Sequence, residues 1–211
     1  MIPAIAYRGR AGELFSPLNH FVSELGQPGV SRLSTIFNLC TIAGGLLLII
    51  FMLGLGLYLK SRPGYIASAI GIFAAASAVL VGIYPINHGS THTAVSVFFF
   101  YGAFVAIIIT NLTIARDRSR RVSKWLIVPG FVSFALFALL ILAIQASATP
   151  TAVLNPSLAS RPNIWMIAVL EWLAVFSLIA WVLSFSLYLQ KKLASAYEGS
   201  EYIGLDQHQG Q

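Results

Sequence analysis

The stretch Phe37–Leu59, FNLCTIAGGLLLIIFMLGLGLYL, contains no charged side chain. Crossing the hydrocarbon core of a bilayer takes about 20 apolar residues in a helix. Four later stretches are also long and apolar, the last with one charged residue, so we predict spans over 34–59, 65–86, 94–115, 125–146 and 164–190. All five are longer than strands and lack a period of two, which excludes a β-barrel. The predicted fold class is all-α, a polytopic transmembrane helix bundle occupying residues 34–190.

The composition agrees with this prediction. The 211 residues are 57% hydrophobic and 9% charged, whereas a soluble domain carries about 25% charged residues. So few charges cannot cover a water-facing surface, which excludes an ordinary soluble enzyme or a nucleic-acid binder. The single cysteine, Cys40, excludes a disulfide framework. We expect the lipid bilayer as surroundings, a membrane-protein partner or an oligomer, and no nucleic acid.

The basic residues predict the orientation. They gather in residues 60–62, 116–124 and 191–192, whereas the other connections hold few. The positive-inside rule therefore places the C-terminus in the cytoplasm and residues 1–33 outside, in a plasma membrane that we expect to be prokaryotic. Residues 191–211 are polar and are expected to form a disordered cytoplasmic tail.

The predicted external segment 1–33 has helical periodicity of its own. Ser16 and Pro17 are typical of a helix start, and Gly26 of a stop. We predict a short amphipathic helix over 17–25 at the outer membrane face. Residues 2–7 read like the end of an apolar segment, so a further helix is expected to precede this sequence.

Ionisable residues point to one membrane face. Glu171 is the only charged residue within a predicted span, and an intramembrane charge is a functional candidate by default. The topology puts it on the external side together with other polar residues, which are His20, His88, His92, Glu24 and Arg161. We expect a small pocket there, to which Asn19, Ser23 and Asn38 also contribute.

Three functions fit this pattern. The first is a non-catalytic accessory, scaffold or sensor subunit, in which Glu171 is a structural partner and His88 a solvated loop residue. The second is a membrane-embedded hydrolase acting on a lipid or another amphiphile. In that enzyme His20, His88 and His92 would bind Zn²⁺, and Glu24 or Glu171 would be the catalytic base. The third is a transporter or ligand-binding module.

Three motifs carry a family resemblance. They are Tyr7-Arg-Gly-Arg-Ala-Gly-Glu13, Phe15-Ser-Pro-Leu-Asn-His-Phe-Val-Ser-Glu-Leu-Gly26 and Phe37-Asn38. In these the chain resembles domain-of-unknown-function family 998, prokaryotic membrane proteins usually drawn with six helices and no established activity. The resemblance implies a six-helix pattern that lacks its first helix here. The polar face is similar, more loosely, to the alkaline-ceramidase-like transmembrane hydrolases, which implies zinc chemistry. The aspartate those enzymes use is missing from the predicted external segments.

Overall fold

The computed structural model describes residues 2–9, 12–118, 122–147 and 161–209. Its long helices are α2 (Ser34–Leu59), α3 (Arg62–Ile83), α4 (Ser90–Arg116), α5 (Ile127–Ala146) and α7 (Met166–Gln209). Each contains a stretch long and apolar enough to cross a membrane, and the described residues contain no strand. The predicted all-α membrane fold is confirmed.

Short helices occupy the connections: α1 (Ile2–Ile5), η1 (Val22–Gly26), η2 (Ile86–His88) and η3 (Lys124–Leu126). The turn between α2 and α3 is tight. Lys60 ends α2 in the left-handed conformation, with φ of 45°, and the Ser61 hydroxyl accepts a hydrogen bond from the Gly64 amide at the start of α3. This N-cap hydrogen bond allows α3 to begin at Arg62, three residues before the start of the span predicted from apolar residues alone.

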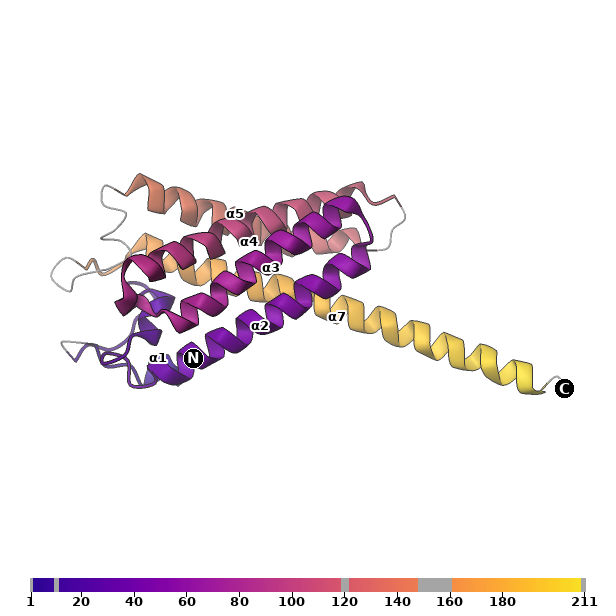
Figure 1. The fold of residues 1–211 in the computed structure, drawn as a ribbon, viewed down its shortest axis with the longest axis horizontal. Coiled ribbons are helices and arrows are strands. Elements are labelled where there is room, and N and C mark those ends of the chain that lie inside the picture. The colour runs from indigo at the N-terminus through magenta and orange to yellow at the C-terminus, as the bar shows by residue number, and fades with distance from the viewer. Residues whose placement is uncertain (1, 10–11, 119–121, 148–160, 210–211) are drawn as a thin grey trace.

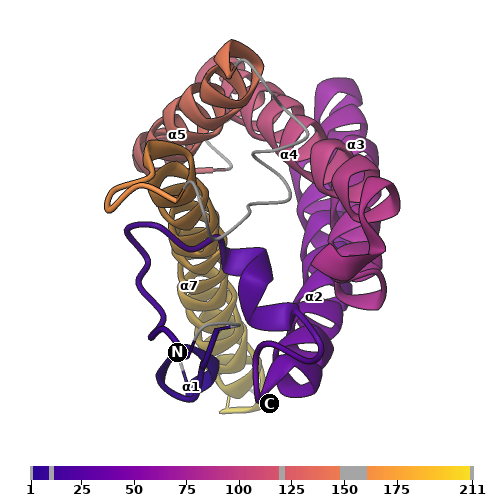
Figure 2. The ribbon, with the colours of Figure 1, turned by 90° about the vertical axis from the view of Figure 1, so that its left-hand side faces the viewer.

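The five long helices follow one another around a ring (Figures 1 and 2). Each packs on its neighbour in the chain, and Phe51 of α2 closes the ring against Trp181 and Phe185 of α7, at ring-centre distances of 5.9 and 6.2 Å. Trp181, Phe185 and Phe137 are among the largest fully buried side chains and belong to the main hydrophobic core of the bundle. Gly82 lets α3 approach α2 closely, because a Cβ atom there would lie 2.8 Å from the Asn38 carbonyl oxygen.

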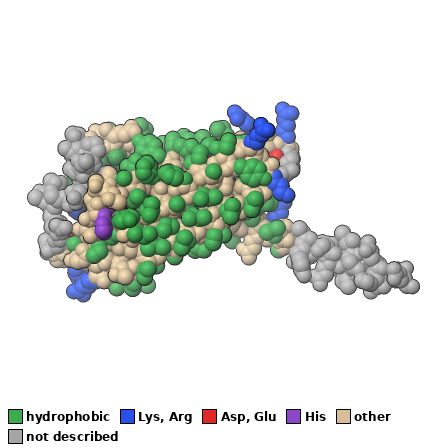
Figure 3. All heavy atoms as spheres, viewed as in Figure 1, with side chains coloured by type: hydrophobic (Ala, Val, Ile, Leu, Met, Phe, Trp, Pro, Cys, Tyr) green, Lys and Arg blue, Asp and Glu red, His purple; other side chains and the backbone are tan. Residues whose placement is uncertain are grey.

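The bundle has two different ends. Lysine and arginine side chains gather at the end formed by the α2–α3 and α4–α5 connections, which we call the basic end (Figure 3). At the other end residues 7–9 and 12–26 fold against the helices, and η1 lies across the ring in Figure 2. We call residues 7–9 and 12–26 the cap, and this end of the bundle the capped end.

The cap differs from the predicted amphipathic helix over 17–25. The Asn19 and His20 amides both turn back onto the Ser16 carbonyl, and a separate 3-10 helix, η1, follows. The segment packs into the bundle end, since Phe21 and Leu25 are buried while Leu18 is 49% exposed. Partners supplied by α7 replace the regular hydrogen bonds of a continuous helix, which the periodicity of one segment could not reveal.

The C-terminal segment also differs from its prediction. Residues expected to be disordered from 191 onward continue α7 to Gln209, and this part of the helix extends beyond the other helices (Figure 1). Elongating an existing helix avoids the unfavourable nucleation step, so a polar segment can remain helical when it follows a membrane span.

Candidate functional site

The centre of the capped end is an ion pair. Arg161, just before α7, directs Nη1 and Nη2 at the two carboxylate oxygens of Glu24, at 3.0 and 2.8 Å. Their side chains are 9% and 4% exposed. Nη1 also donates to the Asn19 carbonyl at 2.6 Å. Two parallel hydrogen bonds fix the orientation of both groups. Arg161 therefore holds the cap through the side chain of Glu24 and through the backbone carbonyl of Asn19.

Glu24 has a second partner inside the cap. Its Oε1 accepts a hydrogen bond from the Phe21 amide at 2.8 Å. Phe21 precedes the first residue of η1, whose leading amides have no partner within the helix. A carboxylate three residues later commonly reaches back to such an amide. Both Glu24 oxygens are therefore engaged in holding the cap together.

Glu171 serves the next amide along the chain. Its Oε2 accepts from the Val22 amide at 2.8 Å, and the side chain is buried. The neighbouring Trp172 donates from Nε1 to the His20 carbonyl at 3.0 Å. The first residues of α7 thus supply an acceptor and a donor to consecutive parts of the cap. Glu171 and Arg161 lie ten residues apart in the sequence. Both bind the cap, but they bind different atoms of it.

His20 is buried in the middle of this cluster. Its ring packs against those of Tyr7 and Phe15, at centre distances of 5.3 and 5.1 Å. Nδ1 lies 3.2 Å from the Ser16 carbonyl oxygen, and Nε2 is buried with no hydrogen-bond partner among the described residues. Burial lowers the pKa of His20, and the nearby Arg161 charge lowers it further, against the opposing charges of Glu24 and Glu13 and the Ser16 hydrogen bond. His20 is thus held in its neutral form at pH 7.

A third contact ties the cap to α2. Asn38 Nδ2 donates to the Gly26 carbonyl at 2.9 Å. A Cβ atom at residue 26 would overlap Asn38 Oδ1, so this close approach requires glycine. Of the residues predicted to line a pocket, Asn38 and Arg161 hold the cap by side-chain hydrogen bonds, and Asn19 contributes its carbonyl. Ser23 is half-buried within η1.

The other two histidines of the predicted zinc site, His88 and His92, have their contacts outside this cluster. His92 is buried in the first turn of α4, where Nδ1 lies 2.8 Å from the Tyr84 carbonyl oxygen and Nε2 lies 3.4 Å from the Ser96 hydroxyl. His88 is exposed in η2, with its ring against Tyr84. Within the described ranges, no three His, Cys, Asp or Glu side chains are grouped so as to hold a metal ion. The predicted zinc site therefore finds no supporting geometry.

Sequence reasoning missed the aromatic half of the site. Tyr7 and Leu25 of the cap form a small buried cluster with Trp172 of α7, and Tyr7 is 1% exposed. Trp165 contributes through its backbone, donating to the Leu18 carbonyl at 2.7 Å. One signal was available in the sequence: Trp165 and Trp172 lie near the start of the one predicted span that contains a charged residue.

This arrangement can position a segment of the chain. Each carboxylate of the cluster accepts from a cap amide, and Glu24 also binds a guanidinium. The buried polar atoms left without a partner here are His20 Nε2, Asn19 Oδ1 and Arg161 Nε, among the described residues.

Comparison with known proteins gives one result. The family model described as "Protein of unknown function (DUF998)" matches residues 2–188, which include the cap and the five long helices up to the last part of α7. Searches of curated proteins and of solved structures gave no match. The chain is an integral membrane protein that belongs to the DUF998 family.

Proposed function

We propose that this membrane protein is a non-catalytic accessory, scaffold or sensor subunit whose N-terminal cap closes one end of the helix bundle. The single observation that carries the proposal is how the cluster's charges are used. Glu24, Glu171 and Arg161 all bind backbone groups of the cap. The groups that a hydrolase would use as bases serve here to hold a structural segment.

The surface of the bundle supports a role in association. In the apolar stretch of α2, 11% of the residues are buried, against 28–44% in the other four spans. The exposed side chains there include Leu46, Leu47 and Ile50. Lipid or a helix of another membrane protein can cover such a face. By the positive-inside rule we infer that the basic end lies in the cytoplasm and the cap outside, in a prokaryotic plasma membrane.

The test is a stoichiometry measurement in native membranes. The protein is extracted with its lipids into polymer-bounded discs, and cross-linked peptides are quantified by mass spectrometry. A subunit role predicts one membrane protein in a constant ratio, with cross-links that persist when Glu171 is replaced by glutamine. Absence of any protein in constant ratio would contradict the proposal.

The hydrolase alternative gets a test of its own. Zinc content is measured by elemental mass spectrometry in the wild type and in H20A, H88A and H92A, together with turnover of fluorescent ester and amide lipids. The proposal expects no stoichiometric zinc that depends on these histidines and no turnover. About one zinc per chain, lost in two or more variants, together with turnover abolished by E171Q in a folded protein, would establish the enzyme instead.

A further inference from the structure

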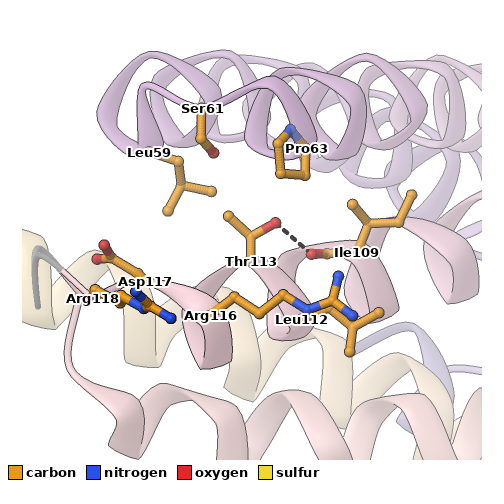
Figure 4. Close-up of a pocket in the computed structure, with 9 residues that line it drawn as sticks. All are labelled: Leu59, Ser61, Pro63, Ile109, Leu112, Thr113, Arg116, Asp117 and Arg118. Atoms are coloured by element: carbon orange, nitrogen blue, oxygen red, sulfur yellow. Dashed lines mark hydrogen bonds between the residues drawn. The ribbon is translucent and has the colours of Figure 1, made fainter.

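The basic end contains a groove that the cap and its proposed role do not involve. It lies between the start of α3 and the end of α4, next to the last residue of α2, and has a volume of about 500 Å³ (Figure 4). Its apolar wall includes Leu59, Ile109 and Leu112, and its outer rim is Arg116, Asp117 and Arg118. A second hollow of about 660 Å³ shares this rim and extends it to Lys124.

The groove changes in polarity along the axis of α4. From Ile109 to Arg116 is two turns of α4, roughly 10 Å at 1.5 Å per residue. One end is therefore lined by aliphatic side chains within the span, and the other by guanidinium groups at the span's end. An amphiphile with an acyl chain and an anionic headgroup has the same order of apolar and charged parts over this distance.

The charges at the rim favour an anion. Arg116, Arg118 and Lys124 are exposed, and Asp117 is the one acid among the described residues that line the two hollows. In Figure 4 the Arg116 side chain points back along α4 towards Leu112, while the Asp117 carboxylate points the opposite way. A guanidinium lying over the apolar wall is stabilised there by an anionic partner in the same groove.

We propose that this groove binds an anionic phospholipid of the surrounding leaflet. The phosphate lies between Arg116, Arg118 and Lys124, and an acyl chain runs along Leu112 and Ile109. Basic pockets between helices at a membrane interface are suited to phosphate headgroups. Exposed Lys60 and Arg62 at the neighbouring turn add to the positive potential at this end. This inference is independent of the subunit role proposed above.

The experiment uses the full chain in phosphatidylcholine discs and follows Trp125 fluorescence. Trp125 is 78% exposed and adjoins Lys124. Brominated phosphatidylglycerol and brominated phosphatidylcholine are the two quenching lipids, and the signal due to Trp125 is the difference from W125F. We expect a saturable preference for phosphatidylglycerol that falls on the order of tenfold in R116Q/R118Q.

The matched control is K191Q/K192Q, which removes the same charge from exposed positions at the same end of the bundle but outside the groove. It should keep the preference. A second variant, Leu112→Trp, narrows the apolar half of the groove without changing its charge. In native mass spectrometry it should weaken the binding of phosphatidylglycerol, with or without bromine. Melting profiles identify any variant that fails to fold, and in that event Leu112→Trp decides.

Three results would overturn the proposal. The wild type could show no preference for the anionic lipid, or the control could lose the preference as much as R116Q/R118Q, which would indicate a diffuse surface potential. Displacement of the lipid by inorganic phosphate at millimolar concentration would show that the site takes free phosphate.

Discussion

The carboxylate of Glu24 and the guanidinium of Arg161 form a two-pronged ion pair at 2.8 and 3.0 Å, although 137 residues separate them in the chain. The pair is almost fully buried and joins the cap to the start of α7. Removing one member leaves the other without compensation in a site with little water, which is far more unfavourable than removing both. The contact therefore makes the cap and the last long helix one unit.

The first prediction concerns this pair. Glu24→Gln should lower the free energy of unfolding by about 3–5 kcal/mol, because Arg161 remains buried and unpaired. Adding Arg161→Gln should recover part of that loss. The measurement is a double-mutant cycle of unfolding in detergent, with the exposed Arg32→Gln as control. Strictly additive losses from the two changes would show that the two side chains do not interact.

The second prediction separates two roles of Glu171. Glu171→Gln keeps an oxygen that can accept from the Val22 amide, so stability should change little. Glu171→Leu removes the acceptor and should lower the free energy of unfolding by about 1–3 kcal/mol, because a buried donor loses its partner. Equal destabilisation by both substitutions would mean that Glu171 stabilises the cap through a negative charge and not through its hydrogen-bond acceptor.

The third prediction is a pH dependence. The pKa of His20 is lowered from its ordinary value of 6.5, chiefly by burial. Below pH 6.5 the unfolded chain therefore binds a proton at this position more readily than the folded one does. The stability that neutral His20 contributes is fully present above pH 6.5 and is lost as the pH falls below it.

Thermal unfolding at about pH 8 and about pH 5 tests this expectation. On going from the higher to the lower pH, the change in stability should be more unfavourable in the wild type than in His20→Gln. His88→Gln is the matched control, because His88 is exposed, while His92 is retained in all three proteins. If His20→Gln and His88→Gln lose stability equally, the dependence arises elsewhere.

The fourth prediction tests how closely the cap sits on α2. In Gly26→Ala the new Cβ would overlap Asn38 Oδ1 and lie 3.1 Å from Phe37 Cδ1, so the cap should shift away from the bundle. The reporter is Leu25→Cys, at a position 2% exposed, in a Cys40→Ser background. Maleimide should label this cysteine faster in the alanine variant.

Gly44→Ala is the control for that experiment, because nothing lies within 4 Å of a Cβ at this helical position. It should leave labelling unchanged and stabilise α2 slightly, by about 0.5–1 kcal/mol. Unchanged labelling in Gly26→Ala would show that Asn38 moves and the cap stays in place.

The positions of the membrane spans could be predicted from the sequence alone, whereas the conformation of the cap could not. The charge-free stretch at 37–59 could only be a membrane helix, since burying a run of that length in a soluble core of 211 residues is not feasible. Its boundary with the next helix was less certain, because Ser61 begins α3 through a hydroxyl cap that hydropathy does not register. The periodicity of residues 15–25 indicated a helix, yet side chains of α7 bind backbone groups of this segment in place of helical hydrogen bonds.

The candidate residues divided in the same way. Placing Glu24, His20, Arg161 and Glu171 near one another followed from topology, because each lies at the same predicted end of the bundle. Topology shows at which end of the bundle a residue lies, but it does not show which residues touch. His88 and His92 were therefore predicted to belong to the same site, although they contact Tyr84 and Ser96.

The amino-acid sequence by itself determined that this protein is a membrane helix bundle, because hydrophobic length and the scarcity of charge are properties of each segment alone. Only the tertiary structure decided that Glu24 pairs with Arg161 and that Glu171 serves a cap amide. Those partners come from segments far apart in the chain, and their hydrogen bonds depend on where the cap's backbone lies against α7.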